Sequence, residues 1–294
     1  MIGPYLLTFR EGLEAAMIIA IILAYLNRTQ RGSLSRHIWY GVGFSILLSL
    51  ILGVSSWLIY GAIPKSAQVL FEGGAALLAV VVLTTMIFWM ATKGRQIRSE
   101  IEQRVQTIAT RGAVLGLVSF SFIVVFREGL ETVVFLMPFL VSNTGATLIG
   151  AVLGVGSAIV LSLAIYVFGM KINLGKFFYY SSLLLILLAA GLFGYGLHEL
   201  IEYFELSGME LGWLAQPAYV LNIAGDSIFH HKGAVGSIFA VMFGYTVKAE
   251  WARVIVHLAY LVVALPLVIR VYHKGRTQST PLRVESQPSL VKEG

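Results

Sequence analysis

The chain has 294 residues, of which 57% are hydrophobic and only 12% charged, and its mean hydropathy is +0.83. This balance excludes an ordinary soluble globule and indicates an integral membrane protein. The formal charge of +6 does not indicate nucleic-acid binding, because basic residues in membrane proteins usually mark the cytoplasmic loops. The chain has no cysteine, so disulfides, thiolate metal sites and iron–sulfur clusters are excluded.

Apolar runs long enough to cross a bilayer recur along the chain. A span needs about 20 residues at a rise of about 1.5 Å each. We therefore predict an all-α, polytopic membrane protein with seven transmembrane helices, at residues 4–26, 38–60, 68–92, 112–140, 147–170, 178–204 and 250–272.

Basic residues are concentrated in alternate connections between these spans. They gather at 27–37, 93–111, 171–176 and in the C-terminal tail. Because an excess of Lys and Arg marks the cytoplasmic side, we expect the N-terminus outside and the C-terminus inside. The charged 93–111 connection is typical of a short, solvated helical extension of the third span.

The first expected span contains Arg-Glu-Gly-Leu-Glu at 10–14, and the fourth repeats it at 127–131. Each charged residue near the centre of a span costs roughly 2.5 to 3.5 kcal/mol, so the motif must be offset by pairing or by function. On a helix, Glu11 and Glu14 share a face, as do Glu128 and Glu131, and each arginine reaches the glutamate four residues on.

The two motifs are 117 residues apart and lie in the first and fourth spans, an odd offset of three, so the second half would be inverted relative to the first. We expect a first three-helix repeat at 1–92, a cytoplasmic connector at 93–111, a second, inverted three-helix repeat at 112–204, an extracytoplasmic segment at 205–249, a seventh helix at 250–272 and a cytoplasmic tail at 273–294.

An inverted repeat would bring four carboxylates together near the membrane midplane, with one charge-balancing arginine on either side. The carboxylates are Glu11, Glu14, Glu128 and Glu131, and the arginines are Arg10 and Arg127. Their net charge of −2 suits a multivalent cation. Carboxylate oxygens are the ligands of hard cations, which include iron, manganese, magnesium and calcium.

Further potential ligands lie toward the outer side. They are Glu72 at the start of the third span, His198, Glu199, Glu202 and Glu205 at the end of the sixth, and Asp226, His230 and His231 in the external segment. Helical spacing allows several of them to form an outer metal-receiving site, although a polar helix end facing water would have the same composition. Met86 and Met90 are expected to pack in the core.

The doubled Arg-Glu-x-x-Glu motif resembles that of the high-affinity iron permeases, which form the oxidase-dependent iron and lead transporter family. The resemblance extends to His198, Glu199 and Glu202 and covers about residues 1–272. It implies that the four motif glutamates carry iron, as Fe³⁺, through a bacterial inner membrane. It also implies no permanently bound cofactor and an extracytoplasmic ferroxidase, peroxidase-like or iron-binding partner protein.

Two other functions are compatible with the same residues. The chain could carry another metal such as lead or manganese, or it could be a proton-coupled carrier of a non-metal solute whose carboxylates relay protons. An intramembrane enzyme is disfavoured because nothing beyond the motif suggests a catalytic water site, and we predict no enzymatic activity.

Overall fold

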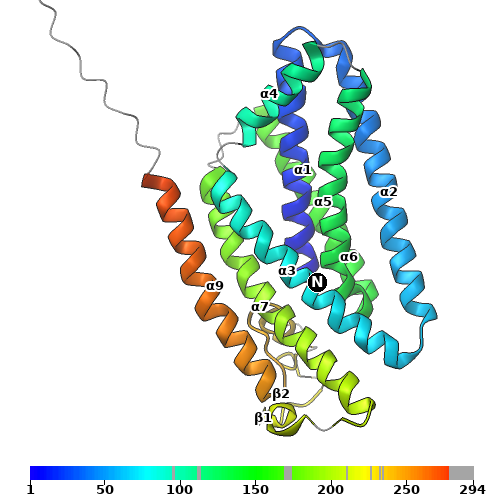
Figure 1. Ribbon diagram of the computed structural model, residues 1–294, viewed down its shortest axis with the longest axis vertical. Helices are drawn as coiled ribbons and strands as arrows, with labels where there is room; N and C mark the ends of the chain where they lie inside the picture. The colour runs from blue at the N-terminus through cyan, green and yellow to red at the C-terminus, as the bar shows by residue number, and fades with distance from the viewer. Residues whose placement is uncertain are drawn as a thin grey trace, which may run out of the picture.

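The computed structural model describes residues 1–94, 97–110, 114–168, 174–209, 211–225, 227–231, 233 and 235–277. Helices account for almost all of them (Figure 1). The α-helices are α1 Ile2–Arg28, α2 Ser35–Ala62, α3 Lys65–Lys93, α4 Ile97–Thr110, α5 Val114–Ser142, α6 Thr144–Phe168, α7 Leu174–Leu206, α8 Gly236–Phe243 and α9 Trp251–Thr277.

Five of these helices are long and apolar enough to cross a membrane: α2, α3, α6, α7 and α9. The helices α1 and α5, with 27 and 29 residues, are equally long, but each carries the three charged residues of the motif. A helical, polytopic membrane protein is thereby confirmed. That α1 and α5 also span the membrane, giving seven spans, stays a prediction.

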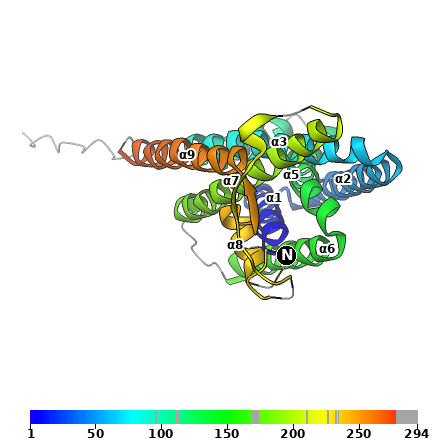
Figure 2. The same cartoon turned by 90° about the horizontal axis from the view of Figure 1, so that it is seen from below.

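The motif helices lie inside the bundle (Figure 2). Helix α1 packs mainly against α6, and α5 packs mainly against α2. The third close pair, α3 with α7, lies beside α9 in Figure 1 and forms a core cluster with it. In the three peripheral helices α2, α6 and α9, only 17% of the apolar window is buried, as expected for surfaces that face lipid.

Glycine allows α2 to approach α5 closely. A Cβ added at Gly41 would lie 2.9 Å from the backbone nitrogen of Phe122, so no larger residue fits there without a shift. Gly41 lies beside Ser121, and eight residues further along both helices Ser49 lies beside Gly129. Residue numbers therefore rise together, and α2 and α5 run parallel.

The contact between α1 and α6 has the same form. A Cβ at Gly154 would lie 2.9 Å from the backbone nitrogen of Phe9, and one at Gly150 would lie 3.2 Å from Pro4 Cβ. These two helices also run parallel. An inverted repeat requires this relation, because the contact of the first motif helix with α6 is then the counterpart of the contact of the second motif helix with α2.

The connector between the repeats differs from the expected solvated extension of the third span. Helix α3 ends at Lys93, and α4 is a separate helix after Gly94. Its apolar side, with Ile101, Val105 and Ala109 at helical spacing, is buried, and Ile101 and Val105 pack in a cluster with residues of α1, α2 and α5. Burial of this face explains why α4 lies against the bundle.

The segment between α7 and α9 contains a small β structure that the sequence does not predict. Strand β1, Pro217–Val220, pairs antiparallel with β2, Lys248–Glu250, and the short η2 helix Gly212–Ala215 precedes them. Helix α8 is capped by Gly244, whose φ of +63° is a left-handed conformation that favours glycine. This segment packs on α7 and α9 at the lower end of Figure 1.

Candidate metal-binding site

The two motifs lie in the middle of α1 and α5, and their central glycines allow neighbouring helices to approach. Gly12 lies against Ala158 of α6, where an added Cβ would be 3.1 Å from the alanine methyl group. Gly129 lies against Ser49 of α2, where an added Cβ would be 2.8 Å from the serine Cβ. Close helix contacts of this kind are typical of small residues within membranes.

In the first motif, Arg10 is fully enclosed and paired with both glutamates. Its NH1 lies 2.8 Å from Glu11 Oε1, and its NH2 lies 2.7 Å from Glu14 Oε1. The exposed fractions are 1% for Arg10, 1% for Glu11 and 4% for Glu14. Burial of three charges is tolerated here because the guanidinium contacts both carboxylates.

In the second motif, the arginine is far more accessible. Arg127 Nε donates a hydrogen bond of 2.8 Å to Glu131 Oε1, and its side chain is 45% exposed, compared with 12% for Glu131. The guanidinium carbon also lies 4.7 Å from the centroid of the Trp89 ring. Both predicted pairs between an arginine and the glutamate four residues on are therefore present, in unlike surroundings.

Three of the four motif glutamates come together. Ligand oxygens of Glu11, Glu128 and Glu131 all lie within 4.8 Å of one another, so the group draws on α1 and on α5. Glu14 is not in this group and is paired with Arg10. Of the four carboxylates predicted to gather, three therefore form one group of potential ligands.

Each of the three carboxylates has an oxygen that is available to a further ligand. One oxygen of each of them, Oε2 in every case, is buried and accepts no hydrogen bond within the described residues. Unpaired buried carboxylate oxygens are costly, and three carboxylates at such distances repel one another. A bound cation would relieve both effects, so the donor set fits a hard metal ion.

A second group of potential ligands lies near the end of α7. Ligand atoms of His198, Glu199 and Glu202 lie within 4.8 Å of one another. Glu199 is buried, whereas Glu202 is exposed. His198 Nδ1 also lies 3.2 Å from Glu250 Oε2 of β2, which connects this strand to the end of α7.

Glu72 of α3 is connected to two tyrosines from other helices. Tyr60 of α2 donates to Glu72 Oε1 at 2.6 Å, and Tyr195 of α7 donates to Glu72 Oε2 at 2.6 Å. Because Tyr195 lies one helical turn before Glu199, the carboxylate of Glu72 is placed beside the second group.

The other predicted outer residues do not join this group. Glu205 is exposed on the last turn of α7, and His230 stacks near His231 with ring centroids 4.2 Å apart. None of these three belongs to either group of potential ligands formed by the described residues. Asp226 lies outside the described residues.

Every member of both groups was predicted from the sequence, but several of the contacts around them were not. Tyr195 could have been found, since it precedes Glu199 by four residues on one helix face. Tyr60, Met86, Trp89 and Glu250 carried no such signal, because their contacts join segments far apart in the chain.

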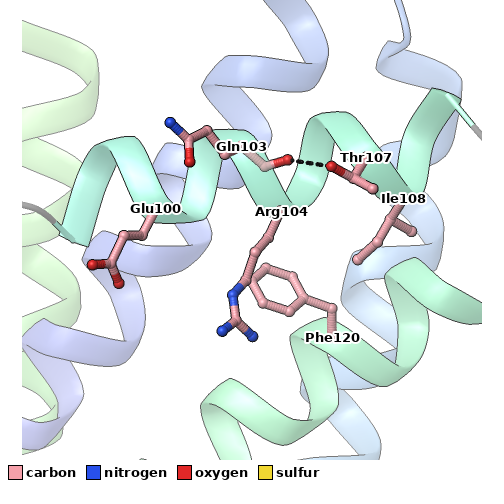
Figure 3. Close-up of a pocket in the computed structure, with 6 residues that line it drawn as sticks. All are labelled: Glu100, Gln103, Arg104, Thr107, Ile108 and Phe120. Carbon is pink, nitrogen blue, oxygen red and sulfur yellow. Dashed lines mark hydrogen bonds between the residues drawn. The ribbon is translucent and has the colours of Figure 1, made fainter.

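A pocket of about 470 Å³ lies between α4 and the start of α5, away from both groups (Figure 3). Figure 3 shows the Arg104 side chain running alongside the ring of Phe120, while Glu100 points away from it. None of the six lining residues belongs to a motif. This pocket offers a single carboxylate and therefore does not resemble a site for a multivalent cation.

Helices of membrane-spanning length around a group of buried carboxylates define a polytopic membrane protein with a candidate cation site. Comparison with known proteins agrees: the profile of the iron permease FTR1 family matches residues 1–270. The chain belongs to this family.

Similar proteins cover nearly the whole chain. An uncharacterized protein of Archaeoglobus fulgidus is 42% identical over 272 residues, which are 92% of this chain and 96% of that one. A protein of Escherichia coli O6:K15:H31 named ferrous iron permease EfeU is 36% identical over 284 residues, 95% of this chain and 99% of its own. The protein of that name in Yersinia pestis is 36% identical over 272 residues, 91% and 93% of the two chains. No solved structure matches the chain significantly.

Proposed function

We propose that this protein imports iron across a bacterial inner membrane and that the ion passes through the group formed by Glu11, Glu128 and Glu131. The observation that carries this proposal is the meeting of three carboxylates from α1 and α5, each with a buried oxygen that accepts no hydrogen bond within the described residues. Hard cations prefer such oxygens, and membership of an iron permease family selects iron among them.

Arginine and iron would alternate as partners of the carboxylates. In the structure, Arg10 forms ion pairs with Glu11 and Glu14, and Arg127 forms an ion pair with Glu131. An iron ion that binds the group replaces these cationic contacts, and Glu14 becomes available as a fourth ligand once Arg10 releases it. The arginines then serve to balance charge and do not bind metal.

The direction of transport follows from the proposed topology. With seven spans, an external N-terminus and an internal C-terminus, the turn at 62–65 and the β strands lie outside, whereas α4 lies in the cytoplasm. The parallel contacts of α1 with α6 and of α2 with α5 support this arrangement, because both follow from an inverted repeat. The basic connections support the orientation.

In this topology, iron would first bind at the second group of potential ligands, near the end of α7. His198, Glu199 and Glu202, with Glu72 beside them, lie at the external end of α7 and α3. We propose that they receive iron from an extracytoplasmic ferroxidase, peroxidase-like or iron-binding protein.

The oxidation state of the transported iron is the most specific part of the proposal. An all-oxygen set of carboxylates favours the harder Fe³⁺, which is the form we propose, whereas relatives from Escherichia coli and Yersinia pestis bear the name ferrous iron permease. Purified protein in liposomes should therefore be offered radioactive iron as ferric citrate and, separately, as Fe²⁺ kept reduced by ascorbate, with Mn²⁺ and Pb²⁺ in parallel.

We expect iron uptake well above that of protein-free liposomes, with Fe³⁺ preferred over Fe²⁺. A matched control is Glu100→Gln, which makes the same change on the exposed side of α4 and should transport normally. Preference for Fe²⁺ would overturn the proposed oxidation state alone. Absence of uptake for every metal, with the protein folded, would instead favour a carrier of a non-metal solute.

A further inference from the structure

Both motif arginines contact the same helix, α3, which carries no part of the motif. Arg10 NH1 donates to Met86 Sδ at 2.7 Å, in addition to its contact with Glu11. Arg127 lies over the Trp89 ring, with its guanidinium carbon 4.7 Å from the centroid. Met86 and Trp89 are three residues apart, so they lie on one face of α3.

These two partners suit arginine better than they suit iron. A thioether and an indole ring carry no formal charge and are poor ligands for a hard cation. A guanidinium is planar, delocalised and weakly hydrated, so it stacks on aromatic rings and accepts a soft, polarisable neighbour. The chemistry of Met86 and Trp89 therefore relates them to the arginines.

Iron and the arginines would share the same carboxylates. Glu11 and Glu131 belong to the group of three carboxylates, and each has an oxygen held by an arginine at 2.8 Å. An ion that binds the unpaired Oε2 atoms weakens the hold of each carboxylate on its arginine, and one that binds both oxygens displaces the arginine. A guanidinium that loses its carboxylate inside a bundle becomes an uncompensated charge unless another partner stays with it.

We propose that Met86 and Trp89 are positioning residues that keep Arg10 and Arg127 beside the carboxylates and remain their partners while iron occupies the site. This inference rests on the proposed iron transport. It assigns to α3 the role of lowering the cost of exchanging arginine for iron, so that its two side chains set the apparent affinity for the ion.

The contact of Arg10 with Met86 and the contact of Arg127 with Trp89 differ in accessibility. Arg10 and Met86 are 1% and 3% exposed, so water does not replace the sulfur contact when Glu11 is released. Arg127 and Trp89 are 45% and 39% exposed, so the protein encloses the second contact much less than the first. The Trp89 contact is the better one to test, because an exposed arginine can be replaced without breaking the core.

A double-mutant cycle isolates the contact of Arg127 with Trp89. Iron uptake into liposomes is measured as KM and maximal rate for the wild type, Trp89→Leu, Arg127→Gln and the double variant. Trp89→Phe retains an aromatic face. The control is Trp57→Leu on α2, where the tryptophan is 40% exposed and makes no arginine stack within the described residues.

We expect Trp89→Leu to raise KM about twofold to tenfold, the range that corresponds to a cation–π contact, with a smaller change in maximal rate. Trp89→Phe should restore most of the affinity, and Trp57→Leu should leave KM unchanged. In the Arg127→Gln background, Trp89→Leu should have no further effect on KM.

An equal rise in KM with and without Arg127 would overturn the proposal, because the ring would then act independently of the arginine. An unchanged KM in Trp89→Leu would overturn it as well. Met86→Leu nearly conserves the side-chain volume but removes the sulfur. An unchanged KM in that variant would overturn the proposed role of Met86 as a partner of Arg10. A wild-type protein without iron uptake would refute the proposed function itself, a result distinct from all of these.

Discussion

Arg10 and Arg127 hold equivalent places in their motifs, yet one is sealed in the bundle and the other is almost half exposed. Arg10 compensates two buried carboxylates at once, whereas Arg127 pairs with a single, partly accessible one. Removal of one member of a buried ion pair leaves the others uncompensated, which is more damaging than loss of an exposed pair.

Arg10→Gln should therefore destabilise the protein by about 3 to 5 kcal/mol, the range for breaking a buried pair. Arg127→Gln should cost roughly 1 kcal/mol or less, because the protein encloses its single ion pair much less. Thermal unfolding in detergent, followed by tryptophan fluorescence, measures the difference. Equal losses of stability in the two variants would contradict the unequal burial.

The spacing of the motif predicted the pairing of each arginine with its own glutamates, because four residues on a helix bring side chains together. It did not predict that Glu14 stays apart from the other three carboxylates, nor that Met86 and Trp89 contact the arginines. Those facts depend on how α3 and α5 are placed against α1, and local spacing carries no information about that placement.

At the scale of elements, the parallel pairs α1 with α6 and α2 with α5 depend on glycine at two contact points. Gly41 and Gly154 each lie where a Cβ would come within 2.9 Å of a neighbouring backbone nitrogen. Gly43 and Gly156 are two residues further along the same helices and have no atom within 4 Å of an added Cβ.

Gly41→Ala and Gly154→Ala should each destabilise the protein by about 1 to 3 kcal/mol, because the helices must move apart to accept the methyl group. Gly43→Ala and Gly156→Ala are the matched controls, and they should be neutral or slightly stabilising since alanine is the better helix former. Melting temperatures in one detergent compare the four variants. Similar melting temperatures for both pairs would argue against close packing at Gly41 and Gly154.

Apolar length identified the long helices correctly, but two features of the connections were wrong or missing. Helix α4 does not continue α3, because its apolar face packs against residues of α1, α2 and α5. Such a contact depends on the tertiary structure. The β1–β2 pair joins residues about 30 positions apart, and strands of three and four residues are too short for a periodic pattern.

At the scale of the whole molecule, the basic connections determine the predicted orientation in the membrane. The parallel helix pairs fit an inverted repeat with either end outside, so only the basic connections choose between the two orientations. Full-length protein with a reporter that fluoresces only in the cytoplasm distinguishes them.

A reporter fused after Lys274 should fluoresce, and one inserted after Asn143, in the short turn between α5 and α6, should stay dark. Signal at the second position with none at the first would reverse the orientation. Signal at both would contradict the odd number of spans that the seven-span topology places between these two positions, namely α6, α7 and α9.

The central claim is that the carboxylates of α1 and α5 act together on one iron ion. It is tested most directly by radioactive iron uptake into liposomes that contain the double variant Glu11→Gln/Glu128→Gln, which removes two charges and nearly preserves shape. We predict a loss of uptake of about tenfold or more, since the low dielectric leaves little water to compensate for missing ligand charge. Glu100→Gln, inserted at the same level, should transport like the wild type. Uptake by the double variant within about twofold of the wild type, a difference worth only about 0.4 kcal/mol, would contradict the claim.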